Sequence, residues 1–201
     1  MIPVFTICMV VFVIVLKINI NKNKIAKDTA SSDFWEREHE ANFARRQDIS
    51  GLDYISIPLE KFPLNLNTDS ERVLRQLSTE KILNLTGISN TDLKLQYGVA
   101  NLEALTAYDE NFTKLVKALA SYGHELIDAG QPDEARVVLE YAVSIHADAK
   151  AIYTMLANLY LSLGEAERIA GLIASADALN SISKSGIIDA LKELQERPNC
   201  A

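Results

Sequence analysis

Asp128-Ala-Gly-Gln-Pro-Asp-Glu-Ala135, the stretch DAGQPDEA, separates two segments whose apolar residues recur at the spacing of an α-helix. Gly130 is suited to end the first helix, because glycine readily adopts the left-handed conformation that closes many helices. Pro132 fits the first turn of the next helix, and the acids that follow it favour the positive end of the helix dipole. The stretch therefore predicts a tight turn between two antiparallel helices.

This helix–turn–helix pattern recurs at an interval of 34 residues, which places Gly130 on Gly164. At most positions the shift brings large residues onto large ones and small residues onto small ones. The pairs are Leu119 with Tyr153, Tyr122 with Leu156, Gly123 with Ala157, Leu126 with Tyr160, Ala135 with Ile169, Leu139 with Ile173 and Ala142 with Ala176. We therefore predict two consecutive repeats, over residues 116–149 and 150–183.

The spacing and these residues resemble the tetratricopeptide repeat, a helix–turn–helix unit of 34 residues. The first repeat matches well, although Ala147 stands where the family usually has proline. In the second repeat Ile169 replaces the expected small residue. The resemblance implies an all-α body, residues 68–201, in which antiparallel helix pairs stack into a superhelix. A helical bundle with a chance match to the repeat is the alternative.

Outside the two repeats the helical period continues, but the shift fails before residue 116. Helices predicted at 69–85 and 92–108 would form a degenerate, repeat-like pair, and a further helix is predicted within 109–130. A closing helix is predicted from Ser185 to Gln195, because its apolar residues again follow the helical period.

The resemblance also implies a binding surface, because such repeats usually bind extended peptides along the inner face of their first helices. The corresponding positions are Lys117, His124 and Ile127 in the first repeat and Thr154, Asn158 and Leu161 in the second. An asparagine at the place of Asn158 commonly holds a peptide backbone in this family. The basic clamp of chaperone-binding members is absent apart from Lys117. The alternative is that these side chains are only solvated.

The N-terminal run MIPVFTICMVVFVIVLKINI predicts a transmembrane anchor over residues 1–20. Residues 2–20 would form a helix of roughly 28 Å, close to the thickness of the hydrocarbon core of a bilayer. A cleaved signal peptide fits less well, because a charged start and a small-residue cleavage site are both absent, and a buried core helix would show a polar face. Lysines at positions 17, 22, 24 and 27 gather at and beyond its C-terminal end. The positive-inside rule then predicts a single-pass protein with its body on the cytoplasmic side.

A polar linker is predicted over residues 21–32, followed by an amphipathic helix at 33–47. Trp35, His39 and Phe43 recur at four-residue spacing and would share one face of that helix. This aromatic stripe could dock onto the helical body. It could also lie on the membrane surface with Arg45 and Arg46 toward lipid phosphates, although the acids of the helix weaken this second interpretation.

The rest of the segment 33–67 contains Pro58 and Pro63, which forbid a continuous helix. No second strand pattern lies nearby. We therefore expect an extended stretch that lies against the helices and forms no sheet.

Composition and motifs limit the possible function. Residues 47–201 carry 13 basic and 22 acidic side chains, and such an acidic body argues against binding of nucleic acids. The sequence has no phosphate-binding glycine loop followed by lysine, no nucleophile elbow and no zinc-peptidase motif. Its two cysteines, at positions 8 and 200, suggest neither a disulfide framework nor a zinc site. We therefore expect no enzyme activity, no metal and no cofactor.

The predicted function is a membrane-anchored scaffold or adaptor that binds a protein or peptide partner through the first-helix surface. The alternative is a structural or assembly subunit of a membrane protein complex. In that case the anchor and the residues Trp35, Phe43, Arg45 and Arg46 would make the contacts.

Overall fold

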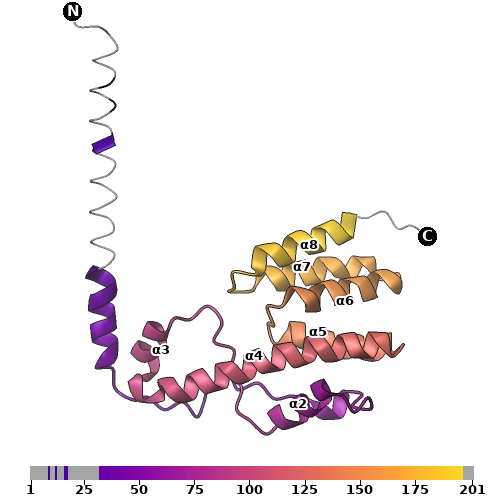
Figure 1. Ribbon diagram of the computed structural model, residues 1–201, viewed down its shortest axis with the longest axis horizontal. Coiled ribbons are helices and arrows are strands. Elements are labelled where there is room, and N and C mark those ends of the chain that lie inside the picture. Colours follow the sequence, from indigo (N-terminus) through magenta and orange to yellow (C-terminus); the bar gives the residue numbers. More distant parts are fainter. Residues whose placement is uncertain (1–8, 10–11, 13–15, 18–31, 197–201) are drawn as a thin grey trace, which may run out of the picture. The chain divides into compact units, whose positions relative to one another are not determined.

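The computed structural model describes residues 9, 12, 16–17 and 32–196 of the chain. All regular secondary structure in these residues is helical (Figure 1), so the all-α prediction is confirmed for the part that is described. The chain divides into two compact units. The first takes residues 1–48 and 89–102, and the second takes residues 49–88 and 103–201.

The first unit contains a helical segment, residues 32–42, and α3, Asn90–Tyr97. Among its described residues, Ala41 and Leu93 are buried apolar side chains, at 0% and 4% exposure. The helical segment ends at residue 42, so the predicted extension to residue 47 is wrong. Residues beyond it bond instead to the end of α3, where the Gln47 N–H donates to the Tyr97 carbonyl at 3.0 Å.

The segment predicted as one helix over 92–108 is interrupted at Gly98. This residue has a φ of +84°, which L-residues rarely adopt, and its N–H donates to the Lys94 carbonyl. A new helix, α4, begins at once and runs from Val99 to Asp128. The predicted break near residue 109 is absent, since α4 continues through this position. The Asp109 carboxylate accepts a hydrogen bond from the Leu85 N–H at 3.0 Å and caps no new helix.

The second unit continues with α4 and contains the two predicted repeats. Its elements are η1 (Leu59–Lys61), α2 (Asp69–Leu77), α5 (Pro132–Ser144), α6 (Lys150–Ser162), η2 (Ala166–Arg168), α7 (Ile169–Asp177) and α8 (Lys184–Glu196). Helix α5 packs on α6, and α8 packs on both α6 and α7 (Figure 1). Helix α8 confirms the predicted closing helix.

The stretch DAGQPDEA forms the predicted turn between α4 and α5. Gly130 has a φ of +73°, and the Gln131 N–H donates to the Leu126 carbonyl at 2.9 Å, the bond that closes a helix in a Schellman motif. Gly164, with a φ of +75°, repeats this arrangement after α6, where the Glu165 N–H donates to the Tyr160 carbonyl at 2.8 Å. Both glycines therefore end helices as expected.

The apolar positions that carry the repeat form the core of this unit. Tyr122, Leu139, Tyr153 and Ile169 are all fully buried, so the large residue at 169 is accommodated. Where α4 meets α5, the missing side chain of Gly123 makes room for a neighbour: a methyl group there would lie 2.6 Å from Leu139 Cδ2. The small residue at this position of the repeat therefore lets α4 and α5 approach closely.

Helix α2 is shorter than the predicted helix 69–85, because the chain after Leu77 bonds to distant segments. The Ile82 carbonyl accepts a hydrogen bond from the Ile55 N–H at 2.9 Å, and the Leu83 N–H donates to the Tyr108 carbonyl at 3.2 Å. Because the first of the two predicted helices ends at Leu77 and the second is interrupted at Gly98, the predicted pair of helices 69–85 and 92–108 is wrong.

Candidate functional site

The positions predicted to bind a partner lie on α4 and α6, between the buried positions of the repeat. Lys117, His124 and Asn158 are exposed, whereas Thr154 is half-buried. The His124 Nδ1 atom lies 2.9 Å from a carboxylate oxygen of Asp128, and the Thr154 hydroxyl donates back to its own helix at 3.1 Å. Polar groups of this set are therefore open to solvent.

Ile127 and Leu161 add apolar surface to the set. Both are half-buried and pack against the core of the second unit. Peptide-binding surfaces usually combine exposed polar groups with partly covered apolar ones, so the residue types suit an extended peptide. Whether they bind one stays a prediction.

Helix α8 extends this surface. The sequence pattern predicted the helix but not its part in the surface. A second shift of 34 residues places Tyr153 on Ile187 and Tyr160 on Leu194, both of which are buried. Helix α8 also packs beside α6, as the first helix of a third repeat would. A hollow of about 400 Å³ opens here, lined by Ser181, Ile182, Lys184, Ser185, Ile188 and Asp189. Repeating the shift in the sequence would have shown that the predicted closing helix takes the place of the first helix of a third repeat.

At the other end of the repeats, the extended stretch that precedes α2 lies against α4 and α5, as expected. Ile57 and Phe62 join the core of the second unit. The Tyr122 hydroxyl donates to the Pro63 carbonyl, and the Tyr141 hydroxyl donates to the Ser56 carbonyl at 3.0 Å. Burial raises the pKa of Tyr141 to about 12, so this hydroxyl remains a donor at neutral pH.

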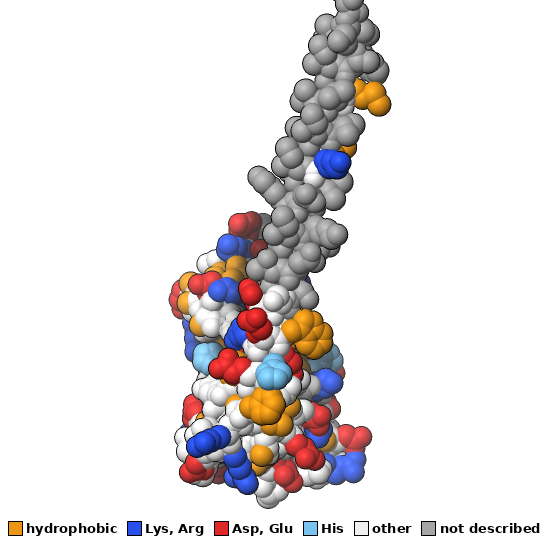
Figure 2. All heavy atoms as spheres, turned by 90° about the vertical axis from the view of Figure 1, so that its left-hand side faces the viewer, with side chains coloured by type: hydrophobic (Ala, Val, Ile, Leu, Met, Phe, Trp, Pro, Cys, Tyr) orange, Lys and Arg blue, Asp and Glu red, His pale blue; other side chains and the backbone are white. Residues whose placement is uncertain are grey.

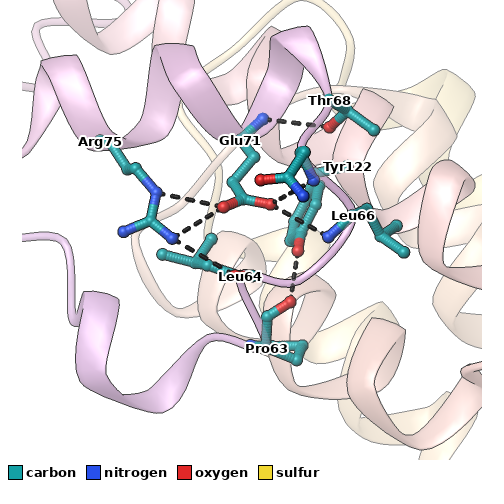
Figure 3. Close-up of polar contacts among 8 residues, drawn as sticks. Pro63, Leu64, Leu66, Thr68, Glu71, Arg75 and Tyr122 are labelled. Carbon is teal, nitrogen blue, oxygen red and sulfur yellow. Dashed lines mark hydrogen bonds and ion pairs between the residues drawn. The ribbon is translucent and has the colours of Figure 1, made fainter.

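Glu71 fixes this stretch to α2 (Figure 3). Its carboxylate accepts hydrogen bonds from the Leu66 and Asn67 amides at 3.1 and 3.0 Å and forms an ion pair with Arg75 at 2.7 Å. Burial raises the pKa of Glu71, but the bonds from Arg75 and from the two amides outweigh burial and leave this pKa below its usual value. The Glu71 N–H also donates to the Thr68 hydroxyl at 3.3 Å, so Thr68 caps the start of α2 while the Glu71 carboxylate clamps the preceding stretch.

The second predicted contact surface lies in the first unit. Trp35 is 65% exposed and Phe43 is 75% exposed, with the exposed His39 ring 4.9 Å from that of Phe43. Docking of this stripe onto the helical body or onto the membrane surface stays a prediction. Figure 2 looks onto the side of the molecule where residues 32–42 lie and shows large hydrophobic side chains at the surface among acidic and histidine side chains.

The two arginines after this helical segment differ in their surroundings. Both side chains are exposed, and the Arg46 Nε atom donates to the Asn101 side chain at 3.3 Å. The Asn101 amide in turn donates to the Gln47 and Tyr97 carbonyls at 2.7 Å. Arg46 is thus part of the fold of the first unit, and Arg45 lies beside it at the surface.

The predicted anchor, residues 1–20, lies outside the described residues except for Met9, Phe12, Leu16 and Lys17. In the described part of the chain, no helix has both the length and the hydrophobicity needed to cross a membrane.

Residues 126–168 match the model of the tetratricopeptide repeat, a range that begins at the end of α4 and covers α5, α6 and η2. No curated protein and no solved structure matches the chain. The family match and the helical architecture agree: the chain carries a tetratricopeptide-like helical repeat, a kind of repeat that commonly serves protein–protein interaction.

Proposed function

We propose that the protein is a membrane-anchored, non-enzymatic scaffold whose repeats bind an extended segment of a protein partner. The arrangement of the repeats carries this proposal. The repeat positions on α4 and α6 are buried, and the positions between them present Lys117, His124 and Asn158 to solvent. A single-pass anchor at residues 2–20 would hold this surface at the cytoplasmic face of the membrane.

The binding surface is tested by co-purification of partners from detergent extracts of native membranes. His124→Glu combined with Asn158→Arg places a negative charge and a bulky cation on the surface. Both side chains are exposed, so the fold should be kept. Val137→Arg, on the exposed side of α5, is the matched control. Loss of a partner from the double variant alone supports the proposal, and unchanged recovery refutes it.

The orientation has its own test. Protease added outside intact cells should leave the body of the chain uncut and should cut it only after the cells are opened. Cleavage in intact cells would place the body on the opposite side of the membrane.

A second candidate, an assembly subunit of a membrane complex, is favoured by the exposed aromatic residues of the first unit. In this case the contacts come from the anchor together with Trp35, Phe43, Arg45 and Arg46. Exchange of residues 1–20 for an unrelated membrane span separates the two candidates. The scaffold keeps its partners after this exchange, whereas the assembly subunit loses its complex.

A further inference from the structure

The aromatic patch of the first unit, defined by Trp35, His39 and Phe43, lies on one face of the helical segment and is exposed. Beside it, the Phe34 ring lies 5.4 Å from that of Trp35 in an edge-to-face contact. Exposed aromatic residues that gather in this way commonly mark an interaction surface.

The opposite side of the same helical segment is bound to α3. Arg37 forms an ion pair with Asp92 at 2.7 Å, and Glu38 accepts bonds from Lys94 and from the Thr91 hydroxyl. Because these contacts occupy the side that carries Arg37, Glu38 and the buried Ala41, the segment cannot turn its aromatic side inward without breaking them. The first unit itself therefore leaves the patch open to an occupant.

The position of the patch in the sequence indicates which occupant is available. Trp35 follows the end of the predicted span, Ile20, by 15 residues, which can bridge at most roughly 50 Å when fully extended. Tryptophan and phenylalanine rings favour the boundary between lipid chains and headgroups. The predicted anchor thus keeps the patch within reach of the membrane surface, where tryptophan and phenylalanine rings are favoured.

The charges around the patch determine the kind of lipid surface. Glu38 forms an ion pair with Lys94, and Asp92 forms one with Arg37. Asp33, Glu36 and Glu40 remain exposed on the helical segment, and their charge would be repelled by anionic headgroups. Docking should therefore be driven by the aromatic rings and should not require anionic lipid.

We propose that Trp35 and Phe43 insert into the interfacial region of the bilayer that carries the anchor, with zwitterionic headgroups as a sufficient surface. This inference rests on the proposed membrane anchor. Insertion of these rings would hold the first unit against the membrane.

The test uses the fact that Trp35 is the only tryptophan of the chain. The full-length protein is reconstituted into phosphatidylcholine vesicles, and the fluorescence of Trp35 is quenched either by acrylamide in water or by lipids brominated near the headgroup. The inference predicts a blue-shifted emission, protection from acrylamide and quenching by the brominated lipid, with no further gain when phosphatidylglycerol is added. The control Trp35→Phe with Ile182→Trp moves the reporter to a fully exposed position of the second unit; it should be quenched by acrylamide only.

The outcomes separate this inference from the function on which it rests. If the chain is not recovered with the vesicles after an alkaline wash, the anchor itself fails. If it is recovered but Trp35 is quenched by acrylamide and not by brominated lipid, the anchor stands and the docking is refuted. If neither quencher reaches Trp35, a protein surface such as a second copy covers the patch, which also overturns the inference.

Discussion

Gly123 and Gly171 offer a matched pair of substitutions, because both lie within helices but only one has a close neighbour. A methyl group at Gly123 would lie 2.6 Å from Leu139 Cδ2 and 3.0 Å from its Cγ, whereas at Gly171 nothing lies within 4 Å. Alanine in place of a helical glycine stabilises by about 0.5–1 kcal/mol, and an extra methyl group in a packed core costs about 1–3 kcal/mol. Gly171→Ala should therefore raise the free energy of unfolding by about 0.5–1 kcal/mol, and Gly123→Ala should lower it by up to about 2 kcal/mol.

Urea unfolding of the full-length chain in detergent, followed by far-ultraviolet circular dichroism, measures the difference. At an m-value of about 2 kcal/mol/M, a difference of about 1–3 kcal/mol separates the two midpoints by roughly 0.5–1.5 M. Leu139→Ala removes the neighbour, so in that background Gly123→Ala should become stabilising. Equal midpoints for Gly123→Ala and Gly171→Ala would refute the close approach of α4 and α5.

Three further predictions follow from local contacts. Glu71→Ala should lower the free energy of unfolding by about 2–4 kcal/mol, because two backbone amides lose their acceptor; in the same urea assay Glu71→Gln should cost less, and equal losses would contradict the clamp. The hydrogen bonds from Lys94 and Thr91 hold the pKa of Glu38 below its usual value of 4.5, so its contribution to stability should be present at neutral pH and lost as the pH falls through this lowered pKa. An NMR titration checks this, and Lys94→Ala should move the pKa upward; an unchanged pKa would exclude the pair. Gly164→Val should lower the thermal stability by more than about 1 kcal/mol, and His146→Gly should raise it by up to about 1 kcal/mol, since both positions have positive φ; a melt without these opposite shifts would contradict the assigned backbone.

The two helix–turn–helix units were predictable because their signals are local. Gly130 ends α4 and Pro132 starts α5 through bonds within a few residues of each other. The end of α2 at Leu77 was not predictable in the same way. The residues after it leave the helical path for hydrogen bonds with Ile55 and Tyr108, which lie far away in the sequence.

The candidate site shows the same division. The exposure of His124 and Asn158 follows from the period of the repeat, and the same period, applied once more, would have placed the closing helix as part of a third repeat. The exposure of Trp35 depends on long-range contacts, because α3 occupies the other side of its helix through Asp92 and Lys94. The spacing of the aromatic residues shows that they share one face of the helix, but it does not show whether α3 covers that face or the opposite one.

Site-specific photo-crosslinking in native membranes tests most directly whether the first-helix surface binds a partner. A photoreactive amino acid is placed at Asn158 in one chain and at Val137 in another, both exposed positions of the same unit. The account predicts a covalent adduct of defined mass from Asn158 and none from Val137. No adduct from Asn158, or the same adducts from both positions, would contradict it.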